Sequence, residues 1–437
     1  MNAILGEAQG LEPRRLAADL LHECREKRLT VEEALLGSRR ASRLSSRDRA
    51  LLVNLLLTSF RHFGEIDAVI GKLLDRPLPR KAGATSDILR IGVAQLLFLE
   101  MPPHAVIDLA VRSAKQDRNA RHFSGLVNAL LRKVSADGVM LRKDLDAPRV
   151  NTPPWLWERW TRAYGPELAR RIAEAHAERP SLDLSFEEDA LPWVGRLGGT
   201  LLPNGQIRLP ANHAPVTELP GFSEGAWWVQ DAAAAIPVTL FGDLSGRLAL
   251  DLCAAPGGKT LQMAAAGARV TAVDVSEARL SRLAANLRRS GLEAEVKCAD
   301  ILGVELSGEW DSVLLDAPCS STGTIRRHPE LPWLKSEGQI AELADLQRRM
   351  LKKAATLVRP GGSLVYCTCS LEPEEGEHQV RAFLGEDSRF EIVPAAVSGL
   401  PEGALRPEGW IRTLPFMEIG GSRGLDGFFA VAMRRRP

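Results

Sequence analysis

The chain has 437 residues, of which 45% are hydrophobic and 25% charged, and its net charge is +1 at pH 7. This composition is typical of a globular protein, and the length predicts two or three domains. No apolar run approaches the ~20 residues that cross a bilayer, and residues 1–20 lack the pattern of a secretory signal. We therefore expect a cytoplasmic protein with no membrane partner.

The charge is unevenly distributed along the chain. Residues 1–150 contain 25 Lys+Arg and 18 Asp+Glu, a net charge of +7, whereas residues 151–437 contain 31 and 37, a net charge of −6. A basic segment joined to a mildly acidic one fits a nucleic-acid-binding domain attached to a catalytic domain. Solvated charge on a helical domain would give the same counts, so charge alone does not decide between them.

The first third of the chain is predicted to be an all-α domain. Residues 50–57 and 88–99 are apolar at helical spacing, and Pro102-Pro103 indicates a helix end. Three segments resemble the NusB family of RNA-binding helical domains: Leu89-Arg90-Ile91-Gly92, Pro103-His104-Ala105-Val106-Ile107 and the run from Gly125 to Val134. The resemblance implies a NusB-like RNA-binding domain over residues 1–145.

A turn-rich segment, residues 146–154, is the predicted domain boundary. Trp155 begins an amphipathic pattern that predicts one helix continuing through Ala175. Trp155, Trp157 and Trp160 could form a base-stacking platform, although an aromatic stripe facing a core is the commoner structure. A mixed, glycine-interrupted stretch follows, and we expect residues 150–230 to form a small α+β connector domain.

Strands and helices alternate from Gly246 onward. This order predicts a parallel, doubly wound, Rossmann-like α/β sheet with ligands at the carboxyl ends of its strands, in a catalytic domain over residues 231–437. The predicted strands are residues 247–252, 268–274, 294–298, 311–316 and 362–367.

The turn after the first of these strands is predicted to hold a cofactor. Its sequence is Cys253-Ala254-Ala255-Pro256-Gly257-Gly258-Lys259. The glycines allow a ligand to approach the backbone closely, but Pro256 removes one N–H donor that a pyrophosphate would need. A Walker phosphate loop is excluded, because Cys253 occupies the position of its first glycine.

Two aspartates follow neighbouring strands. Asp274 is placed to accept hydrogen bonds from ribose hydroxyls, and Asp300 to contact an adenine edge. Each aspartate alone could equally be a helix N-cap. Together with the glycine turn they favour an adenosine carrier without phosphates, S-adenosylmethionine.

Two cysteines lie in loops that follow strands: Cys319 in Pro-Cys-Ser and Cys369 in Thr-Cys-Ser. The C5 atom of cytosine is a weak nucleophile, but addition of a thiolate at C6 makes C5 reactive, and an acid near N3 stabilises the charge that develops. Asp316, at the end of a strand, is the predicted acid. These residues predict covalent catalysis, but their positions leave open which thiol is the nucleophile.

The other cysteines have simpler interpretations. Cys24, Cys298, Cys367 and, in part, Cys253 are expected to be small buried hydrophobic residues. No C-x-x-C pair is present, and the Cys367-x-Cys369 pair has no further ligands at suitable spacing. We therefore expect no metal site.

Several motifs of the C-terminal part resemble the RNA cytosine-5 methyltransferases of the NOL1/NOP2/Sun family. They are Asp-Leu-Cys-Ala-Ala-Pro-Gly-Gly-Lys-Thr (251–260), Asp-Ala-Pro-Cys-Ser-Ser-Thr-Gly-Thr (316–324), Arg-Arg-His-Pro-Glu (326–330), Tyr-Cys-Thr-Cys-Ser (366–370), Gln230-Asp231 and Asp-Gly-Phe-Phe (426–429). The resemblance spans about residues 150–435.

This resemblance implies roles for individual residues. Cys369 would be the nucleophile and Cys319 would assist product release. Residues 253–259, Asp274, Asp300 and Asp316 would line the cofactor site. Residues 326–328, an Arg-Arg-His run, would flank the RNA, for which a solvated loop is the alternative.

Two departures from the family pattern concern the connector. The family usually has Arg-x-Asn after a proline, but Pro180 is followed by Ser181-Leu182-Asp183, which puts an RNA contact there in doubt. Gln230-Asp231 continues into four alanines rather than serines. Neither departure affects the predicted catalytic residues.

With a NusB-like domain in front, the chain resembles the 16S rRNA branch of the family. This implies methylation of a cytosine in 16S rRNA, naked or partly assembled, by a monomer. A tRNA cytosine-5 methyltransferase is one alternative. A non-catalytic RNA-binding or ribosome assembly factor is another.

Overall fold

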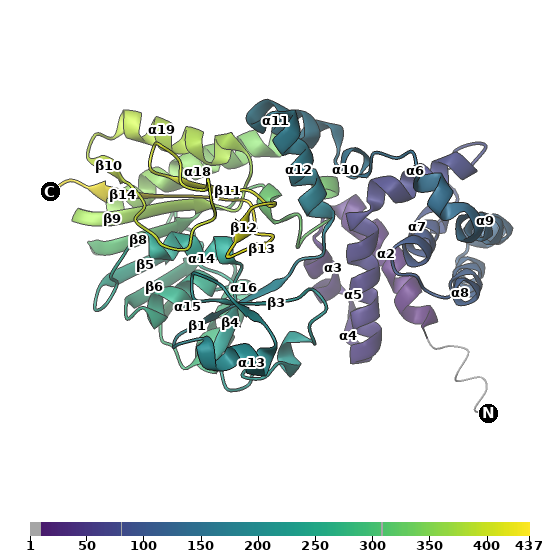
Figure 1. Cartoon of the computed structure of the whole chain (residues 1–437), viewed down its shortest axis with the longest axis horizontal. Coiled ribbons are helices and arrows are strands. Elements are labelled where there is room, and N and C mark those ends of the chain that lie inside the picture. The colour runs from purple at the N-terminus through teal and green to yellow at the C-terminus, as the bar shows by residue number, and fades with distance from the viewer. Residues whose placement is uncertain (1–9, 80, 307–308) are drawn as a thin grey trace. The chain divides into compact units, whose positions relative to one another are not determined.

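The structure is a computed structural model and describes residues 10–79, 81–306 and 309–437. The chain divides into two compact units. The first comprises Met1–Thr161 together with His328–Ser336, and the second comprises Arg162–Arg327 together with Glu337–Pro437. Figure 1 labels the helices and strands.

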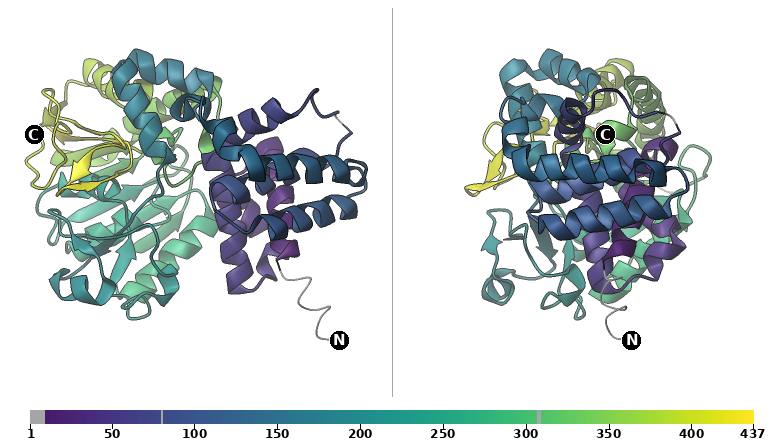
Figure 2. Two further views of the ribbon diagram at one scale, coloured as in Figure 1. Left: turned by 45° about the vertical axis from the view of Figure 1, so that its right-hand side comes forward. Right: turned by 90° about the vertical axis from the view of Figure 1, so that its right-hand side faces the viewer.

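The first unit is built from α-helices packed beside one another (Figure 2), which confirms the predicted all-α domain. Leu52, Leu89 and Leu131 are fully buried in its core. Gly92 allows close packing, because a Cβ there would lie 2.8 Å from Leu131. The helices are α2 (Leu11–Lys27), α3 (Val31–Gly37), α4 (Arg39–Ser42), α5 (Ser46–Arg61), α6 (Phe63–Leu73), α7 (Thr85–Leu97), α8 (Pro103–Gln116), α9 (Ser124–Arg142) and α10 (Ala147–Val150).

A segment from much later in the chain completes this helical core. Helix α17 (Leu331–Leu334) places Leu334 in the core cluster. Trp333 donates from Nε1 to the carbonyl of Phe60 at 3.2 Å, and its ring lies 4.8 Å from the ring of Phe63. No local pattern in the sequence indicates this packing, because Phe60 and Phe63 lie more than 250 residues before Trp333.

The predicted single helix after Trp155 is wrong. Two helices, α11 (Pro154–Tyr164) and α12 (Pro166–Ala177), are separated at Gly165, whose φ of 83° lies in the left-handed region. Trp160 is buried, as expected for a core-facing residue, while Trp155 and Trp157 are half-buried.

The second unit contains a small antiparallel sheet in the order β2-β3-β1-β4, which follows α12 in the chain. Asp183 in β1 accepts hydrogen bonds from Arg208 at 2.7 and 2.8 Å, and from the backbone N–H of Ala232 at 3.0 Å. The acid after Pro180 therefore has a structural role. The strands are β1 (Leu182–Phe186), β2 (Thr200–Leu201), β3 (Ile207–Leu209) and β4 (Trp227–Val229).

The larger sheet has the order β10-β14-β9-β8-β5-β6-β7, with β11 paired to β14. Strands β7, β6, β5, β8 and β9 are parallel, which confirms the α/β class. Strand β14 inserts antiparallel between β9 and β10, a difference from the wholly parallel prediction. It follows irregular chain rather than a crossover helix, so it can return antiparallel. The strands are β5 (Leu248–Leu252), β6 (Arg269–Asp274), β7 (Glu295–Cys298), β8 (Trp310–Asp316), β9 (Val358–Thr368), β10 (Phe390–Val393), β11 (Ile411–Thr413) and β14 (Phe428–Arg435).

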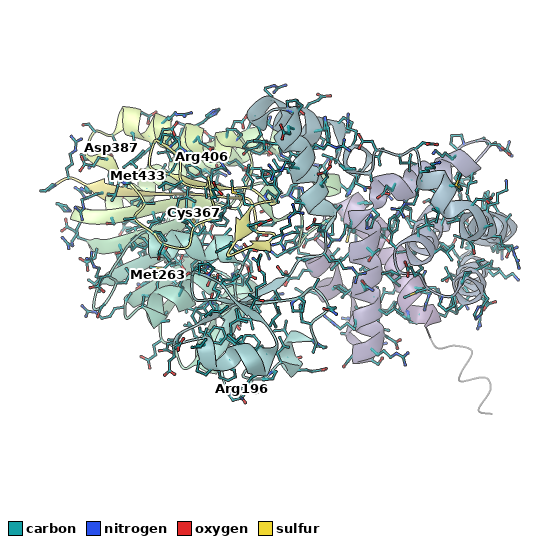
Figure 3. The ribbon with its side chains drawn as sticks, in the orientation of Figure 1. Arg196, Met263, Cys367, Asp387, Arg406 and Met433 are labelled. Carbon is teal, nitrogen blue, oxygen red and sulfur yellow. The ribbon has the colours of Figure 1, made fainter. Side chains whose placement is uncertain are left out.

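Helices cover both faces of this sheet. Val313 and Leu315 of β8 cluster with side chains of α18 and α19, whereas Leu314 clusters with Met263 and Cys367 on the other face (Figure 3 labels the last two). The alternation follows from the period of two along a strand. The helices are α14 (Ala232–Thr239), α15 (Gly258–Ala265), α16 (Glu277–Ser290), α18 (Glu337–Leu357) and α19 (Glu377–Glu386). Among the described helices, none is long and apolar enough to cross a membrane.

Candidate active site

The glycine turn connects the carboxyl end of β5 to the start of α15. Cys253 has a φ of 62°, a left-handed conformation that is costly for a residue with a side chain. Gly257 has a φ of 111°, and a Cβ there would lie 2.8 Å from Leu283. The backbone path of this turn therefore requires a glycine at position 257.

Asp251 lies at the base of this turn and is fully buried. Its Oδ2 accepts a hydrogen bond from Thr260 Oγ1 at 2.6 Å, whereas its buried Oδ1 has no hydrogen-bond partner among the described residues. Burial raises the pKa of this carboxyl to about 7. Asp251 is not among the site residues predicted from the sequence.

The two predicted adenosine-binding aspartates differ in exposure. Asp274, at the end of β6, is buried and accepts hydrogen bonds from the backbone N–H groups of Ala255 at 3.2 Å and Ser276 at 2.9 Å. Arg279 donates to the same carboxylate at 2.8 Å. Asp300, beyond β7, is exposed and accepts from the backbone N–H of Leu302 at 3.0 Å.

The structure brings Asp316 together with the cofactor turn. Lys259 Nζ donates to Asp316 Oδ2 at 2.7 Å, and Cys367 Sγ lies 3.5 Å from Oδ1. Burial acts to lower the pKa of Lys259, but Asp316 outweighs it and raises that pKa. The Lys259 ammonium also lies 5.0 Å from the centre of the Phe428 ring.

The two predicted catalytic cysteines lie side by side, with 3.4 Å between their sulfur atoms. The hydrogen bond from Cys319 lowers the pKa of Cys369, although burial opposes this. The same hydrogen bond, together with burial, raises the pKa of Cys319. Since the thiolate is the nucleophilic form, the pair has one thiol suited to attack and one that keeps its proton.

The loops that carry these thiols are held together by their backbones. Gly323 donates its N–H to the carbonyl of Cys369 at 3.0 Å, and Gly427 donates to the carbonyl of Gly323 at 2.8 Å. A Cβ at Gly323 would lie 1.8 Å from the Gly427 carbonyl oxygen. Ser321 has a φ of 59°, a second left-handed residue at this site.

One sequence interpretation is wrong in detail. Cys298 is exposed rather than buried, although Cys24 and Cys367 are buried as expected. Among the described residues no cluster of three or more His, Cys, Asp or Glu side chains could hold a metal ion.

A buried ion-pair cluster contradicts an RNA contact by Arg326. This side chain is only 2% exposed, and its Nη2 lies 3.0 Å from Asp231 Oδ2. Arg327 pairs with the buried Asp426 but keeps part of its surface exposed, as does His328 in the first unit. Burial, with a contribution from Asp426, raises the pKa of Asp231 to about 6. No local signal in the sequence connects these partners.

The donor set fits an adenosine-bearing cofactor. Acidic side chains occur at or just beyond the carboxyl ends of four adjacent parallel strands, and one of them, Asp251, has an oxygen without a partner. A turn with a required glycine lies among them. Ligands of doubly wound sheets bind at this edge. Fold and site together define the class of Rossmann-like methyltransferases, here with a pair of thiols at the sheet edge.

Comparison with known proteins identifies the family. Residues 242–434 match the 16S rRNA methyltransferase RsmB/F family, and residues 11–136 match the NusB family. The chain is 36% identical to ribosomal RNA small subunit methyltransferase B of Klebsiella pneumoniae subsp. pneumoniae over 97% of its own length and 98% of that protein. It therefore belongs to the ribosomal RNA small subunit methyltransferase B family.

Solved structures agree with this assignment. The crystal structure of PH0851 matches with a TM-score of 0.72 and 25% identity, covering 97% of this chain and 99% of that one. A methyltransferase homologue from Pyrococcus horikoshii matches with a TM-score of 0.54 and 27% identity, covering 68% and 98%. The predicted family and fold class are confirmed.

Proposed function

We propose that this protein methylates C5 of a cytosine in 16S rRNA with S-adenosylmethionine, through a covalent adduct between a cysteine and C6. The observation that carries this proposal is the pair of thiols 3.4 Å apart, with a lowered pKa at Cys369 and a raised pKa at Cys319. Membership in a ribosomal RNA methyltransferase family supports the substrate class.

The cofactor would be held by residues 253–259 together with Asp274, Asp300 and Asp316. S-adenosylmethionine supplies an electrophilic methyl group when it is bound. A ribose hydroxyl that binds Asp274 would replace the hydrogen bond from Arg279, whose side chain is half exposed and free to turn toward solvent. Asp300 is exposed, so it can receive the adenine edge without displacing a buried partner.

Covalent catalysis would begin when the Cys369 thiolate forms a bond to C6 of the cytosine. The electron pair of the C5=C6 bond then moves toward N3 and makes C5 nucleophilic. An ionised carboxylate alone would repel this charge. Asp316 can favour it together with Lys259, whose ammonium lies 2.7 Å away and brings a positive charge beside it. After C5 has been methylated, the C5 proton is lost to water with help from Cys319, the C5=C6 double bond re-forms and Cys369 leaves as its thiolate.

Two cysteine variants test this assignment. Cys369→Ala should abolish methylation, because no thiol then adds to C6. Cys319→Ala should instead accumulate the covalent RNA–protein adduct, because the adduct forms but does not resolve. The adduct is measured as a shifted band on a denaturing gel. An adduct with Cys369→Ala, or none with Cys319→Ala, would contradict these roles.

The RNA substrate is tested separately. Bisulfite sequencing of rRNA and tRNA from a deletion strain should show loss of one 5-methylcytosine in 16S rRNA. Loss in tRNA would support the tRNA alternative, and no loss would support a non-catalytic factor. A cytoplasmic monomer acting on naked or partly assembled 16S rRNA is part of the proposal. The proposal also includes three domains, over residues 1–145, 150–230 and 231–437.

A further inference from the structure

A single buried carboxylate joins the two loops that carry the thiols. Glu375, at the end of a 3₁₀ turn (Pro373–Glu375), is fully buried. Its Oε1 accepts a hydrogen bond from the backbone N–H of Ser320 at 2.9 Å. Its Oε2 accepts from Ser370 Oγ at 2.5 Å and also from Ser320 Oγ. Ser320 directly follows Cys319, and Ser370 directly follows Cys369.

Glu375 is itself fixed from several sides. Its backbone carbonyl accepts hydrogen bonds from the Tyr366 hydroxyl at 2.8 Å and from Thr368 Oγ1 at 3.2 Å, both on β9. Gln347 of α18 donates to Oε1 at 3.1 Å and to the carbonyl of Pro318 at 2.9 Å. Glu375 is therefore anchored through its backbone to the strand that leads to Cys369, and through its carboxylate to a helix that also contacts the Cys319 loop.

The chemistry of this contact requires a carboxylate. All of the groups that face its two oxygens are donors: a backbone N–H, two hydroxyls and a side-chain amide. A carboxylate offers acceptors only, so it can satisfy all of them, and this satisfaction makes its burial tolerable. A glutamine at position 375 could place its NH₂ group where two hydroxyls now donate, so both hydroxyls would have to reorient and would lose this acceptor.

A second contact, made by Arg412 and Glu377, holds the loop that carries Cys369. Arg412 donates to the carbonyl of Ser370 and forms a bidentate ion pair with Glu377 at 3.0 and 2.7 Å. Burial acts to raise the pKa of Glu377, but Arg412 outweighs it and lowers that pKa. This second contact reaches only the Cys369 loop, whereas Glu375 reaches both loops.

We propose that Glu375 is a positioning residue that sets the placement of the Cys319 and Cys369 thiols relative to each other. The expected effect on methylation rests on the proposed function, whereas the expected effect on the placement of the two thiols does not. Without the carboxylate, the two loops lose their shared acceptor, the sulfur atoms separate, and Cys369 loses the hydrogen bond that lowers its pKa. A residue that merely fills space would change stability without changing the geometry of the thiols.

The geometry of the thiols can be measured without any methylation. In a glutathione redox buffer, one glutathione disulfide and the two protein thiols give one Cys319–Cys369 disulfide and two glutathione thiols. The position of this equilibrium reports how well the two sulfur atoms are held for bonding. Peptide mapping by mass spectrometry identifies the pair among the other cysteines.

Glu375→Gln is the principal variant, and Glu386→Gln on the exposed face of α19 is its matched control. We expect Glu375→Gln to lower the equilibrium constant for this disulfide by about tenfold, since small displacements strongly reduce the effective concentration of paired groups. We also expect kcat for methylation to fall by about tenfold or more, with smaller changes in KM for RNA and in the Kd for S-adenosylmethionine. The control should match the wild type in each measurement.

Ser320→Ala and Ser370→Ala keep the proposal testable if Glu375→Gln does not fold. Each removes one hydroxyl donor and leaves the carboxylate in place, so each should shift the disulfide equilibrium in the same direction by a smaller factor. An unchanged disulfide equilibrium in the folded variants would overturn the proposal. A lowered equilibrium in a protein that methylates no cytosine would support it while refuting the proposed function.

Discussion

Replacing Asp251 by asparagine should remove a pH-dependent contribution to the stability of the second unit. Asp251 is fully buried, and burial raises its pKa from an ordinary 3.8 to about 7. Between these two values the folded protein holds a proton that the unfolded chain has lost. Stability from this group is therefore lost as pH rises from about 4 to about 7, and it is constant above that.

The size of the effect follows from the shift. Each pH unit in this window changes the free energy of unfolding by about 1.4 kcal/mol for one group. At about pH 5.5 the wild type keeps ~2 kcal/mol of this contribution, and at about pH 8.5 it keeps none. Asparagine has the same shape and does not titrate. From about pH 5.5 to about pH 8.5, the free energy of unfolding of Asp251→Asn should therefore rise by ~2 kcal/mol relative to that of the wild type.

The difference in the free energy of unfolding is measured by urea denaturation without cofactor, with hydrogen exchange of the strands around β5 as the readout. Other buried carboxyls contribute to the pH dependence of both proteins and cancel in the comparison. Asp243→Asn, at an exposed aspartate of the same unit, is the matched control and should follow the wild type at both pH values. Parallel pH dependences for wild type and Asp251→Asn would refute the reasoning.

Two further substitutions test packing that the sequence did not predict. Trp333→Ala should destabilise the helical unit by about 3 kcal/mol, because it removes a ring packed against this core. The loss is measured as faster hydrogen exchange in α5 and α6. Equal exchange in the wild type and the variant would show that α17 is not part of this core. Gly323→Ala should lower the melting temperature of the second unit, since its Cβ would meet a carbonyl oxygen at 1.8 Å. Gly385→Ala, where a Cβ meets nothing within 4 Å, is the control and should be neutral or gain about 0.5–1 kcal/mol; equal melting temperatures for the two variants would contradict the packing argument.

Elements whose signal lies in the local sequence were the predictable ones. The helices of residues 16–134 follow from apolar spacing, and the buried strands β5 and β8 from continuous apolar runs. The break between α11 and α12 also had a local signal, Gly165-Pro166, which the longer hydrophobic period concealed. The insertion of β14 beside β9 had none, because strand pairing is decided by contacts between distant segments.

Charged residues of the site were predictable only where a motif fixes their neighbours. Lys259 and Asp316 meet because their loops follow the adjacent strands β5 and β8. The polar sequence around Arg326 is typical of an exposed loop. Its burial could not be predicted locally, because its partner Asp231 is 95 positions earlier in the chain. Glu375 lies in an acidic run that resembles a solvated surface, and only the fold reveals the two serines that face it.

The choice between the two thiols shows what structure adds to a motif. Their positions in the sequence leave Cys319 and Cys369 equivalent, since each follows a strand and either could attack a pyrimidine, and only the family resemblance assigns the attack to Cys369. The structure adds a contact of 3.4 Å between the two sulfur atoms; with Cys319 as the donor, this contact lowers the pKa of Cys369 and raises that of Cys319. A thiol with a lowered pKa is suited to the proposed attack on C6, whereas one that keeps its proton cannot compete as the nucleophile. Because this asymmetry depends on a separation of 3.4 Å, the roles proposed for the two cysteines depend on the residues that hold their loops together.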